Sequence, residues 1–181
     1  MHNDWLKFIP DIEHGYAPWL HDHGSLTRRI QHHCSSFHVQ NIYNGLTIAN
    51  HDEIEVLQLT RRQKIYTRDV FLFADNNPVV FAHSVVAAEH LKGAWHALQH
   101  LGNRPLGALL FTHPLIKREA LRFQSLKQGH PLYQQATQKL LSPPSQLLAR
   151  RSVFSLYSAP LLVTEVFLPH ILHLQSGAYG A

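Results

Sequence analysis

Residues 149–169, ARRSVFSLYSAPLLVTEVFLP, decide the fold. Two runs rich in β-branched and aromatic residues flank Ser158-Ala159-Pro160, which has the composition of a turn. The stretch therefore predicts an antiparallel β-hairpin. Its second run carries one carboxylate, Glu165, among apolar neighbours. An unpaired charge buried in a strand costs several kcal/mol, so Glu165 needs either a partner or a function.

Residues 65–87, IYTRDVFLFADNNPVVFAHSVVA, predict a second hairpin around the turn at residues 75–78. Side chains alternate between the two faces of a strand, so Arg68 shares a face with Val70, and Glu165 shares one with Val163. Each charge thus lies on a mostly apolar face. A buried ion pair, a wet sheet edge and a ligand pocket all remain open as explanations.

The rest of the chain combines strand and helix signals. A helix is expected to begin at Ser25, and short strands are expected between residues 38 and 59, with turns or bulges at Asn44-Gly45 and His51-Asp52. Residues 88–101 predict an amphipathic helix, and residues 116–141 are polar and weakly helical. No strict alternation of strand and helix occurs. The pattern favours an α+β fold, with residues 1–181 forming a single domain around an antiparallel sheet.

Composition excludes several classes of protein. The chain has 181 residues, of which 45% are hydrophobic and 15% charged, as in ordinary globular proteins. Its net charge of +4 arises from scattered arginine pairs, which do not favour a nucleic-acid partner. The chain has a single cysteine, Cys34, which indicates a reducing compartment. We interpret Cys34 as a packing residue. No signal peptide or membrane helix is evident, so a cytoplasmic protein without membrane insertion is expected.

Sixteen histidines invite a metal hypothesis, above all in HDHGSLTRRIQHHC, residues 21–34. A dependable zinc signature needs three or four ligands at a recurring spacing, such as HExxH, and none is present. No metal is therefore predicted.

Four segments together resemble the chorismate lyase family, the chorismate pyruvate-lyases of bacterial ubiquinone synthesis. They are SLTRRI (25–30), YTRDVFLFADNNPVVFAHSVV (66–86), LGNRPLGALLF (101–111) and the opening stretch (149–169), in the family's order. The match covers residues 25–169. It implies an antiparallel sheet with helical flaps over an internal ligand cavity, a monomer, no metal and no organic cofactor.

The resemblance also implies site residues. Arg68 matches the family's arginine that binds the ring carboxylate, and Glu165 matches the glutamate that holds the 4-hydroxyl end. Leu26, after the serine of the SLT motif, and Leu106, in the PLG motif, would add backbone and apolar contacts. The implied reaction eliminates pyruvate from chorismate to give 4-hydroxybenzoate, with Glu165 as the proton-handling group and Arg68 as the anchor.

Two regions depart from the family pattern or extend it. His83 stands where relatives often have arginine, so it would hold the second carboxylate only when protonated, which predicts an acid-shifted pH optimum. The polar segment 113–145 has no assigned role, and the tail 170–181 is expected to be flexible and non-catalytic.

Two other functions remain open. The effector-binding domains of some bacterial transcription regulators have a similar fold, so the chain could be a non-catalytic sensor of small carboxylates. Such a regulator needs a DNA-binding domain of roughly 60 residues, for which the first 24 residues leave no room. A metal-dependent hydrolase rests only on the abundance of histidine.

Overall fold

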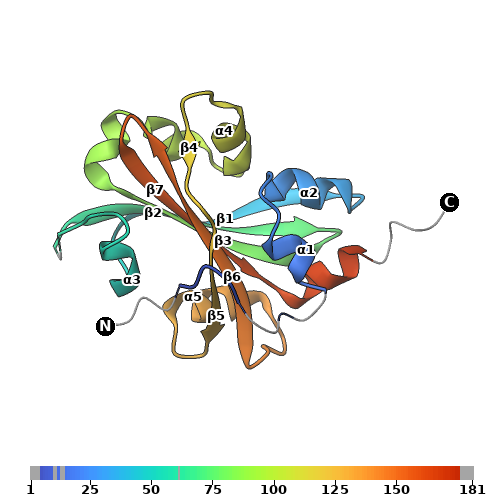
Figure 1. Ribbon diagram of the computed structural model, residues 1–181. Coiled ribbons are helices and arrows are strands. Elements are labelled where there is room, and N and C mark those ends of the chain that lie inside the picture. The colour runs from blue at the N-terminus through green and yellow to red at the C-terminus, as the bar shows by residue number, and fades with distance from the viewer. Residues whose placement is uncertain (1–4, 10–11, 13–14, 61, 176–181) are drawn as a thin grey trace.

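The computed structural model describes residues 5–9, 12, 15–60 and 62–175. A seven-stranded antiparallel sheet forms its centre, in the order β1-β2-β3-β7-β6-β4, with β5 also paired to β6 (Figure 1). The strands are β1 (Phe37–Ile48), β2 (Lys64–Ala74), β3 (Asn77–Ala87), β4 (Lys117–Arg118), β5 (Arg122–Lys127), β6 (Gln146–Leu156) and β7 (Ala159–Phe167). The predicted α+β class is confirmed.

Short helices surround the sheet. The α-helices are α1 (Ala17–Leu20), α2 (Leu26–His32), α3 (His51–Ile54), α4 (Leu106–Thr112) and α5 (Pro131–Ala136). The 3₁₀ helices are η1 (Ala88–Lys92), η2 (His96–His100), η3 (Thr137–Lys139) and η4 (Pro169–Gln175). The predicted cap of α2 is present, since the Ser25 hydroxyl accepts a hydrogen bond from the Arg28 N–H at 3.4 Å. No helix in the described ranges is long and apolar enough to cross a membrane.

Both predicted hairpins form. The β2–β3 turn uses Asp75 and Asn76, with φ of 46° and 65°. The β6–β7 turn uses Tyr157 and Ser158, with φ of 50° and 64°, so it begins one residue before the predicted turn and Ala159 already belongs to β7. Two consecutive residues with positive φ give the two-residue turn that matches the twist of paired strands.

The prediction of several short strands between residues 38 and 59 was wrong. β1 is one twelve-residue strand, and Gly45 pairs with Thr67 within it instead of forming a turn. The eleven residues of β2 pair along β1 on both sides of a register shift between Asn41 and Tyr43, and this long-range pairing overrides the local turn signal. After β1 the chain enters α3, whose first turn is closed by the Glu53 carboxylate accepting from the Asn50 N–H at 2.8 Å.

The single helix predicted over residues 88–101 is divided into η1 and η2. Gly93, with φ −129° and ψ −112°, separates them and lies outside helical geometry. The expected apolar face still packs inward, because Trp95 and Leu98 are almost fully buried. The hydrophobic pattern thus predicted the burial correctly but not the helix type.

Two further expectations differ from the structure. Residues 116–141 contain β4, β5 and α5 instead of being mainly helical. Their helical preference is weak, and hydrogen bonding of β4 and β5 to the edge of β6 outweighs it. The tail does not fray directly after Pro169, since η4 places Ile171 fully inside the core. The remaining tail, residues 176–181, lies outside the described residues.

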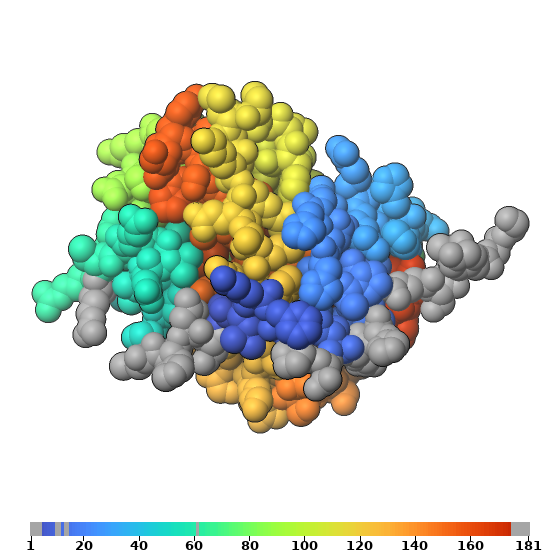
Figure 2. Space-filling model, in the orientation of Figure 1, coloured from blue at the N-terminus to red at the C-terminus, as the bar shows by residue number. Residues whose placement is uncertain are grey.

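The two faces of the sheet have different coverings. α1, α2 and α4 lie over one face, and α3 and α5 lie over the other (Figure 1). In Figure 2 the yellow segment that contains β4 and the blue segment with α1 and α2 cover the middle of the first face. A cavity lies beneath this cover.

Candidate active site

The cavity is enclosed by the sheet below and by α2 and α4 above. Its free space is about 50 Å³ for the centres of water molecules, enough for a few ordered waters. The two covering helices touch at Gly107, where an added Cβ would lie 3.1 Å from the Ser25 hydroxyl oxygen. All four residues predicted for the site, Arg68, Glu165, Leu26 and Leu106, line this cavity.

Strand register explains how Arg68 and Glu165 reach one cavity. Arg68 pairs with Ser84 and so belongs to one row across the sheet, while Glu165 pairs with Ala82 in the next row on the same face. The two residues lie two strands and two positions apart, which corresponds to roughly 12 Å between their Cα atoms. Their side chains therefore mark different ends of the cavity floor.

Arg68 is a buried cation, 2% exposed, and makes no ion pair within the described part of the chain. Its Nη2 donates to the carbonyls of Gly102 and Arg104, at 2.9 and 2.8 Å, which fixes the guanidinium beneath the loop before α4. Its Nε is buried without any hydrogen-bond partner among the described residues. Burial lowers the pKa of Arg68, and the electrostatic influence of Tyr66 and Asp69 partly opposes this effect. An anionic ligand would satisfy both the charge and the free N–H.

Glu165 forms an ion pair, but not with Arg68. Its Oε2 lies 2.6 Å from Nε of Arg150, the residue directly opposite on β6. Arg150 is 1% exposed, and its Nη1 donates to the carbonyls of Trp19, Leu20 and Asp22. Arg150 therefore ties the segment around α1 to the sheet and holds the Glu165 carboxylate in place.

The sequence analysis missed two cavity residues, Arg118 and Arg150. Arg150 lay in the hairpin quoted first, and strand alternation alone could have placed it on one face with Ser152. Arg118 lay in a segment without a clear structural signal. With them the cavity wall holds three guanidinium groups and one carboxylate, an arrangement that favours a ligand with more than one negative charge.

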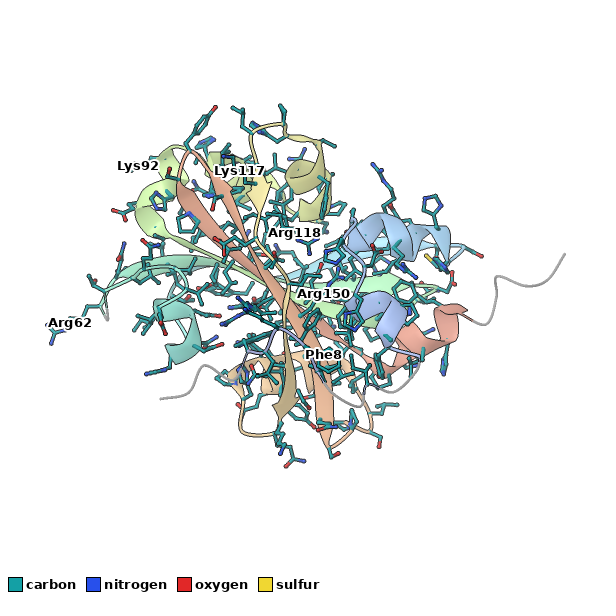
Figure 3. All side chains as sticks on the ribbon, viewed as in Figure 1. Phe8, Arg62, Lys92, Lys117, Arg118 and Arg150 are labelled. Atoms are coloured by element: carbon teal, nitrogen blue, oxygen red, sulfur yellow. The ribbon has the colours of Figure 1, made fainter. Side chains whose placement is uncertain are left out.

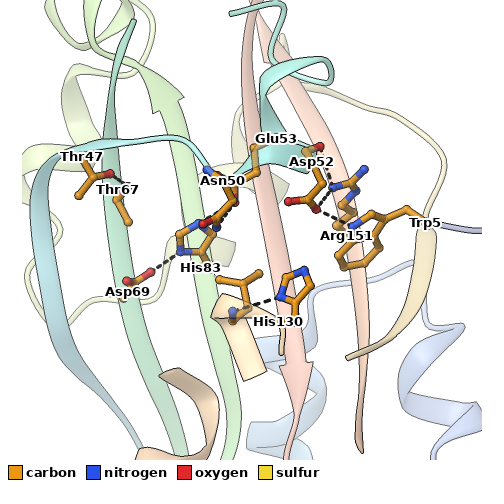
Figure 4. A network of polar contacts seen from close by, with 11 residues as sticks. Trp5, Thr47, Asn50, Asp52, Glu53, Thr67, Asp69, His83, His130 and Arg151 are labelled. Carbon is orange, nitrogen blue, oxygen red and sulfur yellow. Dashed lines mark hydrogen bonds and ion pairs between the residues drawn. The ribbon is translucent and has the colours of Figure 1, made fainter. Parts of the chain in front are cut away.

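His83 lies on the opposite face of the sheet from the cavity, between Asp69 of β2 and Glu53 of α3 (Figure 4). Its ring nitrogens are 2.6 Å from Asp69 Oδ1 and 2.9 Å from Glu53 Oε1. Burial by itself lowers the pKa of His83, but these hydrogen bonds and charges raise it to about 10. The idea that His83 holds a ligand carboxylate was therefore wrong, because both of its nitrogens are occupied away from the cavity.

A second polar cluster lies beside that of His83 (Figure 4). Arg151 donates to Asp52 Oδ2 at 2.9 Å, and the Trp5 indole N–H donates to the same oxygen at 2.7 Å (Figure 4). This network connects α3 and the N-terminal segment to the back of the sheet. Within the described ranges, no group of three or more His, Cys, Asp or Glu side chains is arranged to hold a metal ion.

Comparison with known sequences assigns the family. Residues 4–176 match the family model described as chorismate lyase. A Nitrosomonas europaea protein named "Probable chorismate pyruvate-lyase" is 51% identical to this chain over 86% of it and 88% of its own length. A protein of the same name from Nitrosospira multiformis is 46% identical, over 95% of this chain and 96% of its own. The chain belongs to the chorismate lyase family.

Solved structures with a similar fold include transcription regulators. A GntR-family regulator from Bacillus cereus superposes with a TM-score of 0.55 at 13% identity, over 75% of this chain and 94% of that one. The C-terminal domain of the histidine utilization repressor from Pseudomonas syringae gives 0.52 at 15% identity, over 74% and 92%. At such low identities the likeness concerns the fold alone.

Proposed function

We propose that the protein eliminates pyruvate from chorismate and releases 4-hydroxybenzoate, the aromatic precursor of ubiquinone. The observation that carries this proposal is Arg68, a buried cation with a free N–H in a cavity whose other end holds the Glu165 carboxylate. A small aromatic acid with a hydroxyl group opposite its carboxylate matches these two groups. The names of the relatives support the same reaction.

The reaction depends more on how the protein positions chorismate than on reactive groups of the protein. The bond between the ring and the ether oxygen breaks, and the ring carbon that bears the hydroxyl loses its proton. The released enolpyruvate takes up a proton at its methylene carbon and becomes pyruvate. Formation of the aromatic ring drives the reaction. A well-placed proton-handling group typically contributes about 10² to 10⁴ in rate.

In this proposal each predicted residue has one task. Arg68 binds the ring carboxylate, with Nε as a donor that no described residue satisfies. Glu165, held by Arg150, accepts a hydrogen bond from the ring hydroxyl and handles the proton. Leu26 and Leu106, both more than nine-tenths buried, supply apolar walls from α2 and α4.

Substrate entry requires movement of the cover. The free space of about 50 Å³ suits a few water molecules, not a substituted six-membered ring. We infer that α2 and α4 separate at their contact near Gly107 to admit the ligand and then exclude water.

The test mixes purified protein with chorismate, without added metal or cofactor, and follows 4-hydroxybenzoate and pyruvate. The expected result is equal amounts of the two products, formed faster than in a protein-free control. Binding of chorismate without any product would instead favour a sensor of small carboxylates, the function compatible with the fold of the regulator domains.

A further inference from the structure

Arg118 is the cavity cation to which the proposed function gives no task. It ends β4, a two-residue strand paired with Phe154 and Ser155 of β6. Figure 3 places it near the centre of the molecule beside Arg150, whereas Arg62 and Lys92 lie at the periphery. Arg118 therefore lies inside the molecule, unlike these two peripheral cations (Figure 3).

Three kinds of contact orient the Arg118 side chain. Its Nε donates to the Ser152 hydroxyl at 3.2 Å, and its Nη1 donates to the His23 carbonyl at 2.8 Å. Its guanidinium carbon lies 5.4 Å from the ring centre of Phe111 and 5.2 Å from that of Phe154. These contacts come from the sheet, the segment before α2, and α4, so the guanidinium is fixed from several sides.

Arg118 still has capacity for a ligand. Nη2 makes no hydrogen bond to any described residue, and no ion pair of Arg118 occurs among them. Burial lowers the pKa of Arg118, while the charge of Glu165 raises it and that of Arg150 lowers it, as expected for a cation close to both. Its hydrogen bonds place it at the same end of the cavity, because Ser152 lies two residues from Arg150 on β6 and His23 follows Asp22, whose carbonyl accepts from Arg150. Arg118 thus lies at the Glu165 end of the cavity, unpaired with that carboxylate.

Arg150 differs from Arg118 in that its charge is already paired with a carboxylate, although its Nη2 also makes no hydrogen bond to a described residue. Its Nε is taken by Glu165, and its Nη1 serves three backbone carbonyls. Arg68 is assigned to the ring carboxylate at the other end. Arg118 is therefore the cavity arginine left to meet a second negative charge.

The structure of chorismate determines where its second carboxylate lies in the cavity. In chorismate the enolpyruvyl ether is attached to the carbon next to the one that bears the hydroxyl. If Glu165 holds the hydroxyl, the enolpyruvyl carboxylate must lie at the same end of the cavity. We propose, on the basis of the function proposed above, that Arg118 binds this carboxylate through Nη2 and so distinguishes substrate from product.

The consequence is a difference between two ligands. The product 4-hydroxybenzoate keeps the ring carboxylate and the hydroxyl but has lost the enolpyruvyl carboxylate. Arg118 therefore contributes to binding of chorismate and contributes little to binding of the product. Arg68, by contrast, contributes to both.

The experiment compares Arg118→Gln and Arg118→Lys with the wild-type protein. For Arg118→Gln, kcat/KM for chorismate falls by about 10- to 100-fold, the loss expected for a charge-assisted hydrogen bond, while Kd for 4-hydroxybenzoate changes less than about 3-fold. Arg118→Lys keeps the charge and recovers part of the loss. Lys117→Gln removes the adjacent charge, which is exposed and outside the cavity lining, and keeps full activity.

A non-reacting dianion separates binding from turnover. The compound 3-(carboxymethoxy)-4-hydroxybenzoate carries a second carboxylate and cannot lose pyruvate. Relative to the wild type, Arg118→Gln weakens binding of this compound far more than binding of 4-hydroxybenzoate. An equal loss of both ligands, or failure of both Arg118 variants to fold, would assign Arg118 to maintaining the cavity and overturn the inference. Unchanged kcat/KM in Arg118→Gln would overturn it as well. A wild-type protein that does not convert chorismate contradicts the proposed function itself.

Discussion

Glu165 and Arg150 depend on each other, and this changes what a substitution at Glu165 does. The Arg150 guanidinium is buried, and the Glu165 carboxylate is its ion-pair partner at 2.6 Å. Removing one member of such a pair leaves an uncompensated charge inside the protein. Glu165→Ala is therefore a poor test of catalysis, because it disturbs both the chemistry and the scaffold.

We predict that Glu165→Ala abolishes turnover and also lowers the free energy of unfolding, by about 3 kcal/mol. Glu165→Gln keeps an oxygen that can accept from Arg150 Nε, so it loses turnover with a much smaller loss of stability. Urea unfolding and the chorismate assay on both variants measure the two effects. Full activity of Glu165→Gln would remove Glu165 from the proton-handling role.

His83 contributes to stability in a pH-dependent way. Its pKa rises from 6.5 to about 10 on folding, so its stabilising contribution is fully present below pH 6.5 and is lost as pH rises through about 10. The groups that face it are Asp69 from β2 and Glu53 from α3, and His130 and Arg151 lie farther off without a hydrogen bond to His83 (Figure 4).

We predict that the melting temperature of the wild type falls between pH 7 and 10.5 relative to that of His83→Arg, which stays charged throughout. His83→Gln, measured at pH 6.5, is less stable than the wild type by about 3 kcal/mol. His83 stays protonated between pH 5.5 and 8, so it adds no step to the pH profile of turnover there. Parallel melting curves for wild type and His83→Arg up to pH 10.5 would contradict the assignment.

At the scale of elements, the β2–β3 turn shows how two residues set the register of a hairpin. Asn76 has φ 65°, a left-handed conformation that asparagine and glycine tolerate and β-branched residues do not. Asp75, beside it, accepts hydrogen bonds from the backbone N–H groups of Ser35 and Ser36, both at 2.9 Å. The turn is thus fastened to the segment before β1.

We predict that Asn76→Val costs about 1–2 kcal/mol of stability, whereas Asn76→Gly is nearly neutral. Neither change alters KM for chorismate, since Asn76 is not among the residues that line the cavity. Chemical denaturation of the two variants measures the difference. Equal stability of Asn76→Val and the wild type would mean that the turn relaxes to another conformation.

At the scale of the molecule, ligand binding and stability are linked. A ligand that binds only the folded state stabilises it by about 2.7 kcal/mol at a concentration one hundred times its Kd. The buried cation Arg68 should make an anionic ligand especially stabilising, because that ligand supplies its missing partner.

We predict that 4-hydroxybenzoate raises the melting temperature of the wild type in a concentration-dependent way, and that Arg68→Met removes the effect. The compound 4-hydroxybenzyl alcohol, which keeps the ring hydroxyl but lacks the carboxylate, gives no comparable shift. Prior dialysis against a chelator changes neither the shift nor the turnover. A shift that persists in Arg68→Met would place the carboxylate elsewhere in the cavity.

The sequence alone determined those features that depend on neighbours along the chain. The alternation of residues in two strands placed Arg68 and Glu165 on inward faces, and turn composition located the start of both hairpin turns to within a residue, although each turn ends two residues earlier than predicted. Serine before a helical run located the start of α2. These signals are local, because strand alternation, turn conformation and helix capping act over a few residues.

Only the tertiary structure decided which side chains meet. Strand order places β7 beside β3, so Glu165 lines the same cavity as Arg68 of β2, and the two-residue strand β4 brings Arg118 to it. Register puts His83 opposite Asp69, on the far face from Arg68. Such contacts join residues distant in the chain, and no local preference specifies them. Their energy comes from burial and charge pairing that exist only once the sheet has assembled.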